Sequence, residues 1–150
     1  MMSNQRSAFL KSLIAPLFEA MGDFSLSQVK SELEKIFSQD CLVHMCFPFN
    51  DMRGSDAFYT NCLEKLSTAV PDLERRNLIV LAAITEHGNE WVSTMGNYVG
   101  TFQEQFLDIL PTGHLMHMRF HEFFKFEDRN ITEVQAIWAV SYTHLTLPTI

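Results

Sequence analysis

The sequence predicts an α+β fold built around an antiparallel sheet. Segments with helical spacing of apolar residues occupy the first half of the 150-residue chain, and segments rich in β-branched and aromatic residues occupy the second half. Parallel strands need crossover helices between them, and the sequence shows no helical segment between the later strands. A chain of this length is the size of one domain and buries about two thirds of the surface that it exposes when unfolded.

Two amphipathic helices are expected at the start of the chain. The first covers residues 6–21, where apolar residues recur at helical spacing and Gly22 follows as a natural stop. The second begins at Ser25 or Ser27, places its apolar residues on one face, and ends before Asp40.

A strand and a third helix are expected next. Residues 41–47 form a short apolar run that is followed by turn-forming residues, which is typical of a strand and a turn. Ser55 or Asp56 can cap a helix that runs to about Ala69, because Pro71 then closes it.

The second half of the chain is predicted to form a meander of long strands. Short turn segments with Gly, Pro, Asn and Asp separate these strands. The predicted strands are residues 78–86, 90–102, 115–127 and 131–140.

Composition and charge exclude several classes of function. The formal net charge is −7, the pI is near 5.2, and the scattered Lys and Arg residues form no basic stripe, so we expect no nucleic-acid partner. Charged and Pro residues interrupt the apolar run at 8–17, so we expect neither a signal peptide nor a membrane span. Cys41, Cys46 and Cys62 form no metal-ligand pair, which indicates reduced thiols in a cytoplasmic protein.

Several short motifs carry a family resemblance. They are His44, Pro48 and residues 54–56, 96–102, 110–113, and 124–128 leading to 131–133. In this order and spacing they resemble the SnoaL-like polyketide cyclases of the nuclear transport factor 2-like superfamily, over about residues 6–139. The resemblance implies a cone-shaped, curved antiparallel (mixed) sheet with three N-terminal helices, a pocket for a small hydrophobic organic molecule, and a homodimer formed through the outer face of the sheet.

Glu122 is the first candidate catalytic residue. Alternation along 115–127 places it on the apolar face with Met118 and Phe120, which the resemblance implies is the pocket face. Desolvation there raises the pKa of a carboxyl group and suits it to acid–base chemistry. The other interpretation is a Glu that bonds a buried backbone group or reaches water at the rim.

His44 is the second candidate catalytic residue. It falls where related enzymes place a polar pocket residue on the first strand, although a structural core histidine is an equal interpretation. The other expected pocket residues are Met118, Phe120, Tyr98, Trp138, Val134, Ala136 and Cys46. Tyr98 and Trp91 stand on opposite faces of their strand, so at most one of them points inward.

No metal or cofactor is expected. His114, His117 and His121 would line up as metal ligands on a helix, but their segment is rich in strand-forming residues. The sequence also contains no motif for a redox or phosphoryl-transfer cofactor.

Ala136 departs from the family pattern. The resemblance implies an Asp at the fifth residue after Ile131, and this chain has Ala136 there. Three interpretations remain. The first is an acid–base enzyme (cyclase, isomerase or hydratase type) that acts on a small apolar carbonyl compound through Glu122 and His44. The others are a non-catalytic carrier of a hydrophobic ligand and a dimeric structural module.

The C-terminal segment is expected to lie outside the domain. We assign residues 1–139 to the SnoaL-like domain and 140–150 to a non-native tail, because the tail looks like the translation of a sequencing adapter. A strand extension is the other interpretation, since several of these residues have fair β-propensity.

Overall fold

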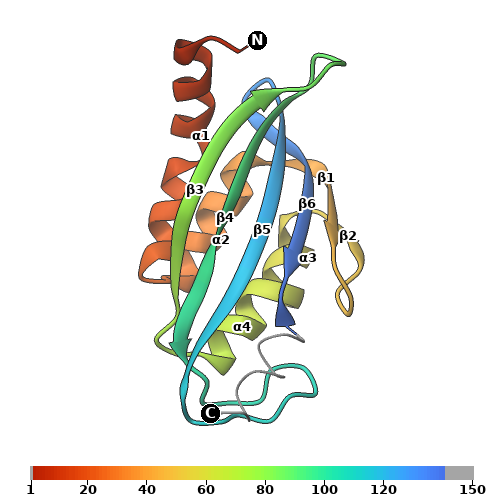
Figure 1. Ribbon diagram of the computed structural model, residues 1–150. Helices are drawn as coiled ribbons and strands as arrows, with labels where there is room; N and C mark the ends of the chain where they lie inside the picture. Colours follow the sequence, from red (N-terminus) through yellow and green to blue (C-terminus); the bar gives the residue numbers. More distant parts are fainter. Residues whose placement is uncertain (1, 141–150) are drawn as a thin grey trace.

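The computed structural model describes residues 2–140 and confirms the α+β fold. The helical segments are α1 (Asn4–Gly22), α2 (Leu26–Ile36), α3 (Ser55–Phe58), the π-helical turn η1 (Tyr59–Leu63) and α4 (Glu64–Ala69). The strands are β1 (Phe37–Met45), β2 (Asp51–Arg53), β3 (Glu74–Ile84), β4 (Glu90–Thr101), β5 (Leu115–Glu127) and β6 (Asn130–Trp138). All helical segments precede β3, with β1 and β2 between α2 and α3, and the strands from β3 to β6 follow, as Figure 1 shows.

The strands form one curved sheet of six strands in the order β2-β1-β6-β5-β4-β3. Figure 1 shows the long strands bowing across the molecule with the helices gathered on one face. The expectation of antiparallel pairing holds for every neighbouring pair except β1 and β6, which run parallel. The sheet is therefore mixed, and its concave face packs against the helices around the hydrophobic core.

The short strand β2 was not predicted, and among the predicted strands the starts of β1 and β3 differ most from the sequence prediction. β1 begins at Phe37, inside the predicted second helix, because Phe37 is buried and pairs with Ile131 of β6. β3 begins at Glu74, four residues earlier than predicted, and a register shift between Asn77 and Ile79 interrupts its pairing with β4. Strand pairing with distant segments decides both boundaries, and local propensity does not report it.

Burial along β5 follows the predicted alternation. Its even-numbered residues from Met116 to Phe126 are buried, while His117, Arg119 and His121 are exposed on the other face. On β4, Tyr98 is buried and Trp91 lies on the outer face, which decides the choice that the sequence left open. No helix within residues 2–140 is long and apolar enough to span a membrane.

Val140 marks the end of the described chain. It is buried against the core, although the sequence assigns it to the tail. The remainder of that segment, residues 141–150, lies outside the described residues, so its assignment as a non-native tail stays a prediction.

Gly96 is required where β3 and β4 approach closely. A Cβ atom there would collide with the carbonyl oxygen of Arg76 and would lie 2.8 Å from Cζ of Phe120. We expect Gly96→Ala to destabilise the fold by about 2 to 3 kcal/mol, because the backbone of β3 has to move. Gly22→Ala is the matched control, since no atom lies within 4 Å of its added Cβ. Urea denaturation of both variants measures the difference, and equal stability would contradict the prediction.

Candidate functional site

A buried ion pair between Arg75 of β3 and Glu122 of β5 forms the centre of the concave face. Arg75 Nη1 lies 2.8 Å from Glu122 Oε1, and neither side chain is more than 2% exposed. Both strands pair with β4, where Tyr98 is opposite Arg75 and Thr94 is opposite Glu122. The inward placement of Glu122 confirms the alternation argument. Arg75 reaches Glu122 as a charged partner, which the sequence did not predict.

The second carboxylate oxygen of Glu122 also has a partner. Trp138, the last residue of β6, donates its indole Nε1–H to Glu122 Oε2 at 2.7 Å. The backbone of Trp138 contacts the Sγ atom of Cys46, with its amide nitrogen at 3.4 Å and its carbonyl oxygen at 3.5 Å. Glu122 thus bonds side chains from two strands, Arg75 of β3 and Trp138 of β6. The alternative interpretation expected a backbone group or water at the rim as its partner, and the structure has these two side chains instead.

Polar groups on β3 and β4 orient the guanidinium of Arg75. Its Nε–H donates to Asn77 Oδ1 at 3.0 Å, and the Thr94 hydroxyl donates to the same oxygen at 3.2 Å. Its Nη1 donates to the Tyr98 hydroxyl at 2.8 Å. Its remaining nitrogen, Nη2, is buried and has no hydrogen-bond partner among the described residues.

Aromatic rings enclose this polar cluster. The Arg75 Cζ atom lies 3.9 Å from the ring centroid of Phe120, and 4.8 and 5.4 Å from those of Phe18 and Tyr98. The Tyr98 ring also contacts Trp138, with centroids 5.3 Å apart at an angle of 65°. Such contacts favour a cation that has lost its water shell.

The electrostatics of the cluster keep Arg75 charged and Tyr98 protonated. Burial by itself lowers the pKa of Arg75, but the charge of Glu122 and the contact with Tyr98 outweigh it and raise the pKa above its usual value. Burial raises the pKa of Tyr98; the charge of Arg75 opposes this increase and that of Glu122 adds to it. The site therefore contains a fixed cation, a carboxylate and a neutral phenol.

His44 does not join the site. The prediction that it faces the pocket is wrong, because it alternates with the buried Val43 and Met45 and so lies on the outer face of β1. Its Nδ1 atom lies 3.0 Å from Asp51 Oδ1 of β2, and its side chain is 33% exposed. His44 is neither a partner of Glu122 nor a core histidine.

The other predicted pocket residues gather on the concave side of the sheet. Met118, Phe120, Tyr98, Trp138, Val134 and Ala136 are buried there, and Cys46 is half-buried beside Trp138. Ala136 is directly opposite Glu122 in the pairing of β5 with β6. The position where the resemblance implies an acid is therefore the cross-strand neighbour of Glu122.

Sequence reasoning missed Arg75, which lies beside Glu122 in this candidate site. The predicted strand began at residue 78, so Arg75 lay outside it. The register shift between Asn77 and Ile79 also changes which residues face inward, from Arg75 and Asn77 before it to Val80 and Ala82 after it. A strict alternation along β3 therefore cannot predict that Arg75 and the apolar residues Val80 and Ala82 face the same side of the sheet.

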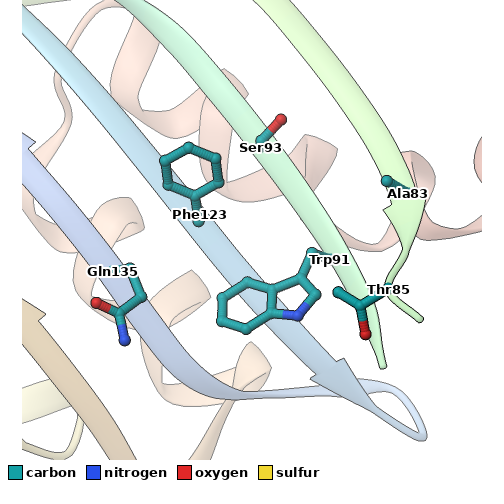
Figure 2. Close-up of a pocket in the computed structure, with 6 residues that line it drawn as sticks. All are labelled: Ala83, Thr85, Trp91, Ser93, Phe123 and Gln135. Atoms are coloured by element: carbon teal, nitrogen blue, oxygen red, sulfur yellow. The ribbon is translucent and has the colours of Figure 1, made fainter. Parts of the chain in front are cut away.

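The outer face carries a shallow apolar hollow of about 370 Å³. Figure 2 shows its lining: Ala83, Thr85, Trp91, Ser93, Phe123 and Gln135. These residues come from the neighbouring strands β3, β4, β5 and β6, except Thr85, which directly follows β3. They lie on the side of the sheet away from the helices. The hollow is separate from the Arg75–Glu122 cluster, which lies on the opposite face.

The structure contains no candidate metal site within residues 2–140. No group of three or more His, Cys, Asp or Glu side chains there is arranged to hold a metal ion. His117 and His121 lie on the exposed face of β5, and His114 precedes that strand.

Comparison with known proteins identifies relatives of this fold. The family model for SnoaL-like polyketide cyclase matches residues 15–141. A proposed SnoaL-like polyketide cyclase from Jannaschia sp. CCS1 superposes with a TM-score of 0.76 at 14% identity, over 99% of each chain. IdmH, a proposed polyketide cyclase from Streptomyces antibioticus, has a TM-score of 0.72 at 19% identity, over 94% of this chain and 99% of its own.

A third solved structure carries a different description. AclR, a proposed hydroxylase from Streptomyces galilaeus, has a TM-score of 0.73 at 20% identity, over 95% of this chain and 87% of its own. None of the curated proteins compared matches the chain. These structural likenesses establish the fold, and the family model covers most of the sequence; the chain belongs to the SnoaL-like polyketide cyclase family.

Proposed function

We propose that the protein is an acid–base enzyme of the cyclase, isomerase or hydratase type, acting on a small, largely apolar carbonyl compound. The observation that carries the proposal is the buried Glu122 carboxylate, held by Arg75 and Trp138 on the concave face. Titratable groups in such apolar surroundings are typical of sites that transfer protons.

The surroundings of Glu122 fit an apolar or aromatic ligand. The rings of Tyr98 and Phe120 are 5.1 Å apart, and Phe49 extends the aromatic contacts from Trp138 toward Phe106. Pockets for small molecules combine such apolar walls with a few fixed polar groups.

Glu122 can perform the proton transfer that these reactions share. One of its oxygens takes a proton from the carbon next to the ligand carbonyl, so the C–H bond breaks and its electron pair moves onto the carbonyl oxygen as an enolate. Return of the proton to another carbon isomerises the compound. Attack of the enolate carbon on a second carbonyl closes a ring, and the resulting alkoxide takes the proton from Glu122. Each carboxylate oxygen keeps a lone pair for this step besides the one used by Arg75 or Trp138.

The position of Ala136 supports Glu122 as the acid–base group. Ala136 is the cross-strand partner of Glu122, so an acid supplied from β5 reaches the same part of the site as one supplied from β6. Two carboxylates at these neighbouring positions would repel each other. Ala136 leaves room for the longer Glu122 side chain and removes that repulsion.

Deuterium exchange tests the proposed chemistry. We expect the protein to accelerate exchange of the hydrogens next to the carbonyl of α-tetralone in deuterium oxide, in proportion to protein concentration and above the buffer rate. Proton NMR measures the loss of these signals, and heat-denatured protein is the control. Binding of the ketone without faster exchange would contradict the enzymatic proposal and favour the carrier.

We also propose a homodimer formed through the outer face of the sheet. Large apolar side chains are exposed there, with Leu81 at 56%, Phe123 at 44% and Ile137 at 60%, around the hollow of Figure 2. Contiguous apolar surface of this kind is typical of an interface between subunits.

Sedimentation equilibrium is expected to report about twice the chain mass of 17.3 kDa. Phe123→Asp is expected to give the single-chain mass, because it places a charge in the interface. Leu110→Asp is the control, since Leu110 is exposed in the loop before β5. A wild-type protein that sediments as a monomer at micromolar concentration would contradict the proposal.

We further propose a cytoplasmic location. Cys41, Cys46 and Cys62 are all free, and burial raises the pKa of the Cys41 and Cys62 thiols to about 12. Reduced, protonated thiols suit a reducing compartment. Cell fractionation tests this location.

A further inference from the structure

The guanidinium of Arg75 has hydrogen-bonding capacity that no residue in 2–140 uses. Arginine carries five N–H hydrogens. Asn77 takes the Nε hydrogen, and Tyr98 and Glu122 lie 2.8 Å from Nη1. The two hydrogens on Nη2 have no acceptor among the described residues, although the side chain is fully buried. Leaving a buried charged group without one of its hydrogen bonds is strongly unfavourable, so an acceptor is expected there.

The Tyr98 hydroxyl adds a second unused donor. Because arginine can only donate, Tyr98 Oη accepts the hydrogen bond from Arg75 Nη1, which leaves its own O–H hydrogen free. No hydrogen bond donated by Tyr98 is found within residues 2–140. Burial raises the pKa of Tyr98, so the hydroxyl keeps this hydrogen at neutral pH.

The surrounding rings restrict where an acceptor can lie. Guanidinium hydrogens point outward in the plane of the group. The rings of Phe120, Phe18 and Tyr98 stand 3.9 to 5.4 Å from Cζ, and Asn77 and Glu122 occupy other in-plane positions. An acceptor can therefore approach Nη2 only in the plane of the guanidinium. The Tyr98 hydroxyl contacts Nη1 of the same guanidinium, so it lies near that acceptor position.

The charge balance of the site selects an uncharged acceptor. Arg75 and Glu122 are the buried charged side chains within the described residues, and they neutralise each other. A carboxylate ligand would add a buried negative charge without a partner, which is costly. The net charge of −7 on the whole chain disfavours an anion further.

We propose that Arg75 Nη2 and the Tyr98 hydroxyl together bind one uncharged carbonyl oxygen of the ligand. This inference rests on the proposed function for the presence of a ligand on the concave face, and it assigns the group that orients it. Glu122 lies against the same guanidinium, so a carbonyl held at Nη2 brings its neighbouring carbon toward the carboxylate. Arg75 and Tyr98 then also stabilise the negative charge that develops on this oxygen during enolisation.

Three probes of similar shape test the ligand class. They are α-tetralone labelled with carbon-13 at its carbonyl, tetralin, which lacks the oxygen, and naphthoate, which carries a carboxylate. We expect the wild-type protein to bind α-tetralone at least about 10-fold more tightly than either of the others, since hydrogen bonds to charged groups contribute about 1.5 to 3 kcal/mol. The carbonyl carbon resonance is expected to move downfield on binding.

Two conservative variants test the residues. Tyr98→Phe and Arg75→Lys are each expected to weaken α-tetralone binding about 10-fold and to reduce the carbon-13 shift, while tetralin binding stays unchanged. Tyr59→Phe is the control, because Tyr59 is in η1 and its ring contacts Lys30.

Several results would overturn the assignment. They are equal binding of α-tetralone and tetralin, tighter binding of naphthoate, no binding of any probe at millimolar concentration, and unchanged α-tetralone binding in both variants, which would indicate a buried water at Nη2. Selective binding without hydrogen exchange would sustain this inference and reject the proposed enzyme. Hydrogen exchange without selective binding of α-tetralone would reject this inference and support the proposed enzyme.

Discussion

Glu122→Gln is expected to lower the rate of α-tetralone hydrogen exchange by about 100-fold or more. A positioned general base contributes about 10² to 10⁴ in rate, and an amide cannot take the proton. The amide keeps the shape of the side chain and can still accept a hydrogen bond from Arg75 or from Trp138. The loss should therefore appear in the rate at saturating ketone, with a smaller change in the ketone concentration needed for half-saturation.

Glu127→Gln is the matched control for this experiment. Glu127 ends the same strand and is exposed, so its substitution should leave the exchange rate unchanged. Circular dichroism at the assay temperature shows whether the Glu122 variant is folded. A folded Glu122→Gln protein that exchanges at the wild-type rate would assign Glu122 a purely structural role.

Arg75→Met is expected to destabilise the protein by about 3 to 5 kcal/mol. The substitution leaves the Glu122 carboxylate buried with Trp138 as its remaining partner, and a buried charge without its counter-ion is strongly destabilising. For a domain of this size the loss corresponds to a decrease in melting temperature of roughly 6 to 20 °C. Thermal and urea denaturation both measure it.

The double variant Arg75→Met with Glu122→Leu distinguishes the effect of an unpaired buried charge from the effect of changed packing. It removes both members of the ion pair, so it is expected to be more stable than Arg75→Met alone, because apolar pairs often replace buried ion pairs with little cost. Arg119→Met is the control, since Arg119 bonds Asn97 on the exposed face of β5. A loss below about 1 kcal/mol for Arg75→Met would show that Glu122 needs no counter-ion.

The sequence alone determined the order of elements and the inner face of β5. Helical periodicity and strand periodicity are local properties, so they could be read before any contact was known. Alternation along β5 correctly placed Glu122, Met118 and Phe120 inside, because this strand pairs continuously with β4 and follows a strict period of two. Gly96, which belongs to one of the family motifs, lies where the backbones of β3 and β4 leave no room for a Cβ atom.

The tertiary structure alone decided how the polar groups combine. Arg75 reaches Glu122 across β4, and the register shift in β3 that accompanies this placement has no signature in local composition. His44 turned outward because the parallel pairing of β1 with β6 and the short strand β2 set which face of β1 is buried. These contacts join residues far apart in the chain, and strand register between such segments is set by the burial of the whole sheet face, which no local pattern contains.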